Sequence, residues 1–166
     1  AGGVLLKHLV EVGLHSNAMD NKKFFYFTTC GWMMWNWLVS SLMLNSTICL
    51  YDGSPFYPNS DILWRYAEEE KFHFFGTSAK YIDALSKFKN KISEKFDLGN
   101  LETIGSTGSP LVHESFDYVS NNIKKDVHLA SVSGGTDIVG CFVGGNPISP
   151  VYRGEIQGPI LGMDVQ

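Results

Sequence analysis

Short apolar runs alternate along this chain with segments of helical periodicity, and this alternation constrains the fold more than any other feature. Residues 24–27 form a continuous aromatic run and residues 47–51 a β-branched one, as expected of buried strands, whereas apolar residues recur at helical spacing in residues 4–12. Further strands are predicted at 72–75, 101–104 and 127–132, and further helices at 32–44, 61–70, 78–88 and 114–123. Strands and helices in alternation build parallel sheets through right-handed crossovers. The sequence therefore predicts an α/β fold of alternating strand-helix units around a mainly parallel sheet.

The last third of the chain has a different character. From Gly134 onward, glycine and proline are frequent and the apolar runs are short, which predicts a Gly/Pro-rich region of short strands, either antiparallel or at the edge of a subdomain. Residues 163–166 read as one more strand. In the first third, residues 32–44 are apolar around nearly the whole helix, which predicts a helix that is buried on both sides.

Charge and cysteine content argue against several classes of protein. A formal net charge of −4 gives no reason to expect a nucleic-acid partner or an anionic membrane surface. The apolar stretch 24–44 is broken by Gly31 and Asn36, so a membrane span is not predicted. Cys30, Cys49 and Cys141 are odd in number and far apart. Their spacing argues against disulfides and a zinc site, and favours a reducing compartment such as the cytoplasm.

Several common catalytic and nucleotide-binding motifs do not occur. The chain has no GxGxxG, no GxxxxGK[ST], no HExxH and no GxSxG sequence. The five histidines lie far apart, and only His8 and His15 share a helix face. Two surface positions are the simplest interpretation of that pair.

Ligands in open α/β sheets bind at the carboxyl ends of the strands, so the turns after the predicted strands are the places to search. These turns are residues 28–32, 52–58, 76–78, 105–110 and 131–137. The turn 105–110 reads Gly-Ser-Thr-Gly-Ser-Pro, and its small residues would let a flat ring or a phosphate approach the backbone. An ordinary strand-to-helix turn explains it equally simply.

The turn 131–137 combines close backbone approach with hydroxyls and a carboxylate. Ser133, Gly134, Gly135 and Thr136 would face phosphate oxygens, and Asp137 has the oxygen ligand that Mg²⁺ prefers. A polar loop with an Asx-type turn is the alternative. Because both turns fall at one edge of the predicted sheet, a nucleotide that lies across the strand ends would account for the two together.

These residues resemble known sequences. Thr136-Asp137 resembles the Thr-Glu element of the adenylate-forming superfamily of acyl-CoA synthetases, luciferases and peptide-synthetase adenylation domains, and residues 105–110 resemble its adenine-binding turn. Longer strings at 28–37, 75–81, 133–142 and 154–159 are similar to the acetoacetyl-CoA synthetase family. The resemblance extends over essentially the whole chain and implies the α/β large domain of an adenylate-forming enzyme.

The resemblance also implies a reaction and roles for individual residues. ATP and acetoacetate would give an acyl-adenylate and pyrophosphate, and CoA would then displace AMP, a step of lipid and ketone-body metabolism. Gly108, Ser109 and Pro110 would lie against adenine, Thr136 would bind phosphate, and Asp137 would hold Mg²⁺, although many relatives have Glu there. The acyl pocket would be formed by Trp32, Met34 and Gly134.

Residues 1–166 are expected to be one internal piece of that large domain. By the resemblance, the phosphate loop would precede Ala1, and the mobile C-terminal lid domain would follow Gln166. The isolated piece is therefore expected to be inactive without the rest of the parent chain. Two alternatives stay open, namely another short-chain acyl-CoA synthetase, and a non-catalytic α/β binding domain derived from such an enzyme.

Gly134 carries the expectation about substrate size. Acetyl-CoA synthetases have tryptophan at the corresponding position, where it limits the pocket to acetate, and glycine would leave room for a four-carbon keto acid. Gly134→Trp is then expected to exclude acetoacetate while it still admits acetate. The alternative is that Gly134 only permits a tight turn.

Overall fold

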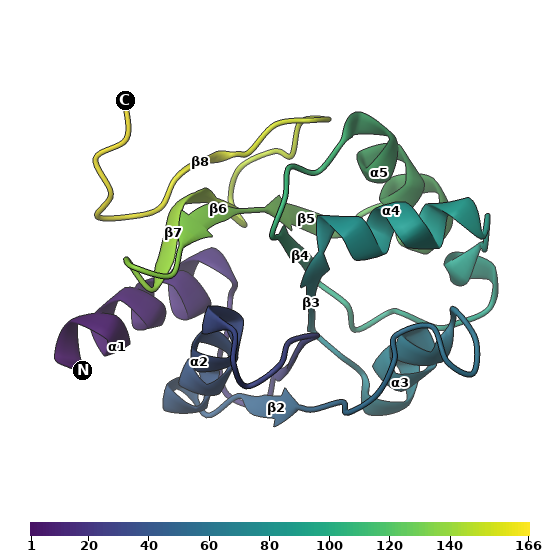
Figure 1. The fold of residues 1–166 in the computed structure, drawn as a ribbon, viewed down its shortest axis with the longest axis horizontal. Helices are drawn as coiled ribbons and strands as arrows, with labels where there is room; N and C mark the ends of the chain where they lie inside the picture. The colour runs from purple at the N-terminus through teal and green to yellow at the C-terminus, as the bar shows by residue number, and fades with distance from the viewer.

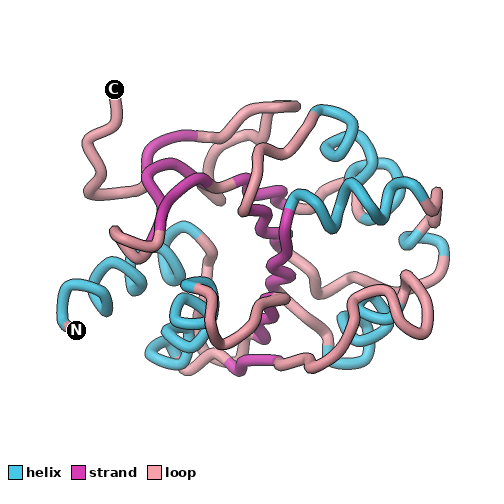
Figure 2. Tube along the Cα trace, in the orientation of Figure 1, coloured by secondary structure: helices cyan, strands magenta, loops and turns pink.

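A central sheet of five parallel strands organises the computed structural model, which describes residues 1–166 (Figures 1 and 2). The strands run in the order β2-β1-β3-β4-β5, and neighbouring strands pair in parallel throughout. Their bounds are Lys23–Tyr26 (β1), Thr47–Cys49 (β2), Phe74–Ser78 (β3), Thr103–Thr107 (β4) and His128–Ser131 (β5). The prediction of an α/β fold with a mainly parallel sheet is confirmed.

Helices cover both faces of this sheet, which makes it a three-layer, doubly wound arrangement (Figure 1). One face carries α3 (Ile62–Glu70), α4 (Ala79–Lys87) and α5 (His113–Tyr118), which continues as the π-helix η4 (Val119–Ile123). The other face carries α1 (Gly2–His8) with its π-helical continuation η1 (Leu9–His15), and α2 (Met33–Ser40) with the short 3₁₀ turn η2 (Ser41–Leu44). A further 3₁₀ turn, η3, spans Ile92–Glu94.

Burial on both faces explains why the strands are continuous apolar runs instead of alternating ones. Phe25 and Phe75 point into the larger core beneath α3, α4 and α5, whereas Phe24 and Phe74 point into the smaller core beneath η1 and α2. Aromatic rings stack in both cores, with ring centroids 4.4 Å apart for Trp64 and Phe75 and 4.9 Å apart for Phe24 and Phe74. The aromatic run at the start of the chain is thus one strand that supplies both cores.

The strands β3 and β4 reach further toward their carboxyl ends than the sequence predicts. Gly76 pairs with Gly105 in parallel register, so both glycines lie inside strands and not in turns. Aromatic rings lie directly over them: a Cβ atom on Gly105 would come 2.6 Å from Cζ of Phe74, and one on Gly76 would overlap the ring of Tyr26. These glycines make room for aromatic packing, a requirement that looks the same as a turn signal in the sequence.

Two other predictions differ from the structure. The helix predicted at 32–44 is not buried on both sides, because it tightens into η2, where Leu42 and Met43 are 49% and 41% exposed. Residues 163–166 do not form a strand; the last strand is β8 (Gly158–Pro159), and a turn at Gly162 with φ +85° follows it. Periodicity identifies a helix but does not say how many of its faces are covered.

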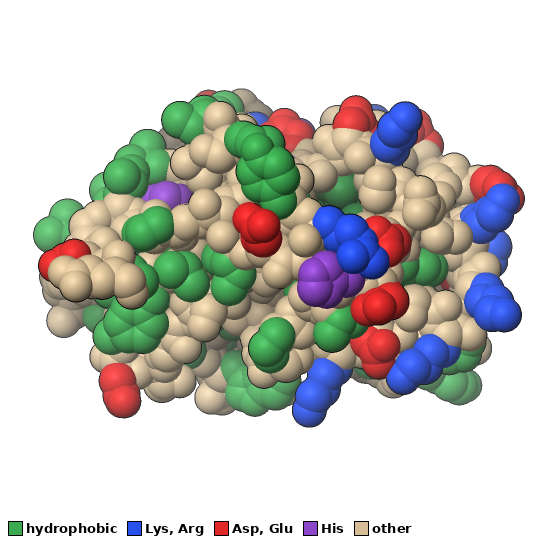
Figure 3. All heavy atoms as spheres, turned by 90° about the horizontal axis from the view of Figure 1, so that it is seen from above, with side chains coloured by type: hydrophobic (Ala, Val, Ile, Leu, Met, Phe, Trp, Pro, Cys, Tyr) green, Lys and Arg blue, Asp and Glu red, His purple; other side chains and the backbone are tan.

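A second, antiparallel sheet occupies the C-terminal third, as predicted. It has the order β6-β7-β8, with β6 at Ser133–Gly135 and β7 at Gly140–Gly144. Seen from above in Figure 3, lysine and arginine side chains gather over the half of the molecule that contains α3, α4 and α5, whereas the other half shows mainly hydrophobic and uncharged groups. None of the helices combines the length and the apolar character that a membrane crossing requires.

A buried carboxylate joins the first helix to the second sheet. Glu11 is 2% exposed; its carboxylate accepts hydrogen bonds from Nε1 of Trp37 (3.1 Å) and the backbone N–H of Cys141 (2.8 Å), and it pairs with Nζ of Lys7 (3.1 Å). Lys7 in turn donates to the carbonyl oxygen of Cys141 (3.0 Å). Glu11 and Lys7 therefore bind both the backbone N–H and the carbonyl oxygen of Cys141, a residue of β7.

Removal of this carboxylate is expected to be costly. Glu11→Ala leaves the Lys7 ammonium and two N–H donors without their buried partner, which should lower the free energy of unfolding by about 3 kcal/mol. Glu69→Ala, at an exposed helical position without an ion pair, should change it by less than about 0.5 kcal/mol. Denaturant titration of both variants measures the difference, and equal small effects would mean that the Glu11 cluster does not stabilise the fold.

Candidate functional site

A cavity of about 450 Å³ opens at the carboxyl ends of β1, β3 and β4. Its floor includes Tyr26 at the end of β1, Ser78 at the end of β3 and Thr107 at the end of β4. With the strand order β2-β1-β3, the winding of the sheet reverses between β1 and β3, and ligands of open α/β sheets bind at such a switch point. Both the place and the volume are those of a small-molecule site.

Three segments that are distant in the sequence meet in this cavity. Residues 31–34 span the start of α2, residues 107–109 span the end of β4, and residues 134–136 come from the β6–β7 hairpin. Of the residues predicted for the site, the cavity is lined by Trp32, Met34, Gly108, Ser109, Gly134, Gly135 and Thr136. The predicted turn at 52–58 contributes nothing to its wall.

A second cavity of about 310 Å³ adjoins the first, because the two share Thr107, Gly108, Ser109 and Gly134. Pro110 and Ser133, which were also predicted for the site, line this second cavity together with Ile156. Oγ1 of Thr107 donates a hydrogen bond to the carbonyl oxygen of Val132 (3.2 Å), which fastens the end of β4 to the segment before β6. The predicted nucleotide residues thus line one continuous pair of cavities.

Thr136 and Asp137 begin the four-residue turn, residues 136–139, that joins β6 to β7. Thr136 lines the larger cavity, whereas the side chain of Asp137 is exposed, takes part in no hydrogen bond or ion pair, and lines neither cavity. No group of three or more His, Cys, Asp or Glu side chains lies close enough to form a metal site. A single free carboxylate suits Mg²⁺ when the phosphates of a ligand supply the other oxygens.

Gly134 borders both cavities through its backbone. A Cβ atom there would overlap the carbonyl oxygen of Gly140 and come 2.6 Å from Cα of Cys141, both of which are backbone atoms of β7. The pairing of β6 with β7 is irregular at this point, with a register shift between Ser133 and Gly134. A side chain at position 134 would therefore meet the neighbouring strand, and the geometry favours the close-packing role over the pocket-size role.

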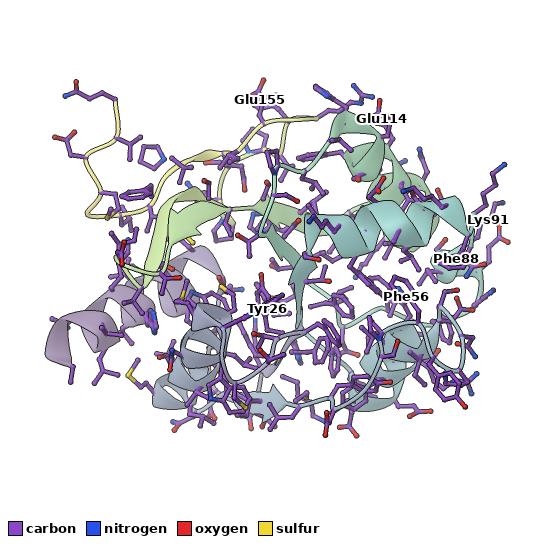
Figure 4. All side chains as sticks on the ribbon, viewed as in Figure 1. Tyr26, Phe56, Phe88, Lys91, Glu114 and Glu155 are labelled. Carbon is purple, nitrogen blue, oxygen red and sulfur yellow. The ribbon has the colours of Figure 1, made fainter.

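Several residues of the cavity wall are not among the predicted ones. Tyr26 points between α2 and β3 (Figure 4), and its hydroxyl donates to the carbonyl oxygen of Thr77 (3.1 Å). Burial raises the pKa of the Cys141 thiol to about 12, so this thiol stays protonated and is no nucleophile at neutral pH.

Lys80 is the one charged side chain on the wall and has no ion pair or hydrogen bond. Lys80 lies in the first turn of α4, two residues after the cap Ser78. This position directly after a strand end was the sequence feature that could have indicated a place in the site.

Fold and cavities together define an open, doubly wound α/β domain with a small-molecule site at the switch point of its sheet. Over its whole length, the chain is similar to one portion of acetoacetyl-CoA synthetases. It is 58% identical to the acetoacetyl-coenzyme A synthetase of Rhizobium meliloti over 99% of its residues, and 48% identical to that of Danio rerio over 100%. The solved structure of acetoacetyl-CoA synthetase from Streptomyces lividans superposes with a TM-score of 0.91 at 44% identity over 97% of the chain.

These matches cover nearly all of this chain but only a part of each matched protein. The chain spans about a quarter of the length of each of these three proteins, 25% in every case. No protein-family model matches the chain. The resemblance inferred from the sequence strings is confirmed, and the chain corresponds to one portion of a longer enzyme in its relatives.

Proposed function

We propose that this chain is part of an ATP-dependent acyl-CoA ligase that converts acetoacetate and CoA to acetoacetyl-CoA through an acyl-adenylate. The observation that carries the proposal is the convergence of residues 31–34, 107–109 and 134–136 on one cavity. The resemblance assigns those three segments to the acyl group, the adenine and the phosphate respectively. Relatives of high identity over the whole chain are synthetases of this kind by name, which supports the same reaction.

In this proposal the nucleotide lies across the carboxyl ends of the strands. Gly108, Ser109 and Pro110 pack against adenine, where the absence of large side chains permits contact with the backbone. The hydroxyl of Thr136 donates a hydrogen bond to the α-phosphate, which is retained in AMP, and Ser133, Gly134 and Gly135 present backbone groups beside it. Gly108 has a positive φ of +87°, which glycine adopts without strain, and a Cβ atom there would have no other atom within 4 Å.

Asp137 is the residue that would hold Mg²⁺ beside the phosphates. Its free, exposed carboxylate fits that role because no cation of the protein neutralises it. Bound Mg²⁺ would neutralise the charge that develops on the phosphates while the carboxylate of the acid attacks. Adenylation gives a poor electrophile a good leaving group, and the thiol of CoA then displaces AMP to form the thioester.

The acyl group would lie at the aromatic end of the cavity, against Trp32 and Met34. Trp32 is 59% exposed, so it is a wall that a ligand can cover. Lys80 adds the only positive charge to this wall. An ammonium group without a partner suits an acid that carries a second acceptor, such as the keto oxygen of acetoacetate.

Lys80→Met tests this preference. The variant keeps an unbranched, flexible side chain that lacks only the terminal ammonium position, so it removes a charged hydrogen-bond donor, an interaction commonly worth about 1.5–3 kcal/mol. The ratio of kcat/KM for acetoacetate over butanoate should fall about tenfold, or about 1.4 kcal/mol. Lys125→Met, at an exposed lysine that borders neither cavity of the site, is the matched control. Equal losses for both acids would remove Lys80 from substrate recognition.

The chain would supply only part of the active site. We propose that residues 1–166 form a portion of the large, AMP-binding domain, and that the phosphate loop and the lid domain are supplied by other parts of the longer protein. Support comes from the quarter-length match to the relatives. A cytoplasmic location agrees with three free cysteines, which need a reducing environment.

The experiment that tests the function is an acid-dependent assay of AMP formation by the full-length protein with ATP, Mg²⁺ and CoA. Acetoacetate should be the preferred substrate over acetate and butanoate. AMP formation that depends equally on all three acids would indicate a general short-chain ligase. Absence of AMP formation with any acid, while the cavity still binds AMP, would indicate a binding domain.

A further inference from the structure

Four side chains of the first helix bind the backbone of β7 and the residues on either side of it. Lys7 and Glu11 hold Cys141, and the remaining two contacts come from His8 and His15. The surface positions expected for these histidines are wrong: His8 is 0% and His15 8% exposed. Each histidine has partners on both ring nitrogens, so both are fixed parts of the interior.

His15 connects two segments at the far end of β7. Its Nδ1 donates to the carbonyl oxygen of Gly145 (2.8 Å), because a carbonyl oxygen only accepts. Its Nε2 accepts a hydrogen bond from the backbone N–H of Leu161 (3.0 Å). These two bonds account fully for His15 as a structural residue.

His8 lies at the other end, beneath the turn 136–139. Its Nε2 donates to the carbonyl oxygen of Val139 (2.5 Å), and its Nδ1 lies 2.8 Å from Oγ of Ser40, the last residue of α2. The imidazole therefore bridges α1, α2 and the turn that carries Thr136 and Asp137. The contact joins residues 131 positions apart in the sequence.

Val139 is the residue in this turn that needs to be held. Its φ is +52°, in the left-handed region, where a β-branched side chain is a conformational outlier. Its N–H donates to the carbonyl oxygen of Thr136 (3.0 Å), so the left-handed backbone at Val139 closes the turn that begins at Thr136. A strained residue keeps such a conformation only when its surroundings fix it.

We infer that His8 is a positioning residue, which fixes the backbone of Val139 and thereby sets the place of Thr136 and Asp137 in the site. The effect on the turn stands by itself, whereas the effect on catalysis rests on the proposed function. His8 touches neither cavity, so it acts only through the turn.

Two variants of similar polarity separate the two contacts of His8. The amide nitrogen of His8→Gln can take the place of Nε2 and donate to Val139, whereas the shorter amide of His8→Asn takes the place of Nδ1 and reaches only Ser40. The test uses the full-length protein and follows amide hydrogen exchange by mass spectrometry. The peptide of interest covers residues 133–141, and peptides that cover β3 and β4 report on the rest of the fold.

In His8→Asn, exchange at residues 133–141 should rise at least about tenfold, the effect expected when one hydrogen bond is lost, while β3 and β4 keep their wild-type rates. His8→Gln should stay within about threefold of wild type. Val139→Gly removes the strain, so adding it should reduce the effect of His8→Asn by at least about threefold. Equal effects of His8→Asn with and without Val139→Gly, or faster exchange throughout both sheets, would overturn the inference.

The effect of His8 on catalysis is measured separately, by the kinetics of adenylation. In His8→Asn, kcat/KM for Mg·ATP in adenylation should fall at least about tenfold, and His8→Gln should restore it. Faster exchange of the turn with unchanged adenylation would refute the positioning role in catalysis. A wild-type protein without adenylation activity would instead contradict the proposed function, and the exchange experiment would still decide whether His8 holds the turn.

Discussion

Asp137→Asn should reduce adenylation by the full-length enzyme about 100-fold or more, which corresponds to about 2.7 kcal/mol of transition-state stabilisation. The substitution keeps the shape of the side chain and removes the charge that would hold Mg²⁺ beside the phosphates. The Asp137 side chain is exposed and makes no hydrogen bond or ion pair, so the melting temperature should not change. Pyrophosphate release at saturating Mg·ATP measures the chemical effect separately from the fold.

The matched control for this prediction is Asp52→Asn. Asp52 is also an exposed aspartate in a loop that follows a strand, but its chain neighbours line neither cavity, whereas Thr136, which precedes Asp137, lines the larger one. Its loss should leave adenylation within about twofold of wild type. An unchanged adenylation rate in Asp137→Asn, at saturating Mg·ATP, would remove Asp137 from the phosphate site.

Gly134→Ala should damage the β6–β7 hairpin, and with it activity toward every acid. The added methyl group would overlap the backbone of Gly140 and Cys141, and backbone atoms cannot move aside as a flexible side chain can. Overpacking of this kind costs about 1–3 kcal/mol, and activity toward acetate and acetoacetate should fall alike, by about tenfold or more. Thermal unfolding and kcat/KM for both acids are the two measurements.

The neighbouring glycine gives a strict control. A Cβ atom on Gly135 would have no atom within 4 Å, although Gly135 lies in the same strand and borders the same cavity. Gly135→Ala should therefore keep its stability within about 0.5 kcal/mol of wild type. If Gly134→Ala instead lowered activity toward acetoacetate alone at unchanged stability, position 134 would limit the size of the acyl group, as the sequence comparison with acetyl-CoA synthetases first indicated.

Local patterns were sufficient to predict the α/β class, the parallel sheet and most of the elements. The cap of α4 illustrates why. Oγ of Ser78 accepts a hydrogen bond from the backbone N–H of Tyr81 (3.2 Å), so the interaction depends only on residues 78–81, which are consecutive in the sequence. The ends of β3 and β4 were misplaced for the opposite reason. Gly76 and Gly105 lie inside strands, where the absence of a side chain leaves room for the rings of Tyr26 and Phe74, and no local pattern identifies which ring will lie over a glycine.

In the candidate site too, local patterns were predictable from the sequence, whereas contacts between distant residues were not. Ser109 and Thr136 could be placed at one sheet edge because parallel strands bring their carboxyl ends together. The support beneath the site could not be predicted, since His8 and Val139 are 131 residues apart and Glu11 and Cys141 are 130 apart. Lys80 was missed because an exposed lysine in a first helical turn is ordinary, and only the folded wall of the cavity distinguishes it.

The proposed function places these cavities in an enzyme that activates acetoacetate as an adenylate. Exchange of labelled pyrophosphate into ATP, measured with the full-length protein in the absence of CoA, tests it most directly because it isolates the first half of the reaction. We expect exchange that requires acetoacetate and Mg²⁺, proceeds without CoA, and falls about 100-fold in Asp137→Asn. Exchange that is independent of the acid, or no exchange under conditions in which the same preparation forms acetoacetyl-CoA, would contradict the adenylate mechanism.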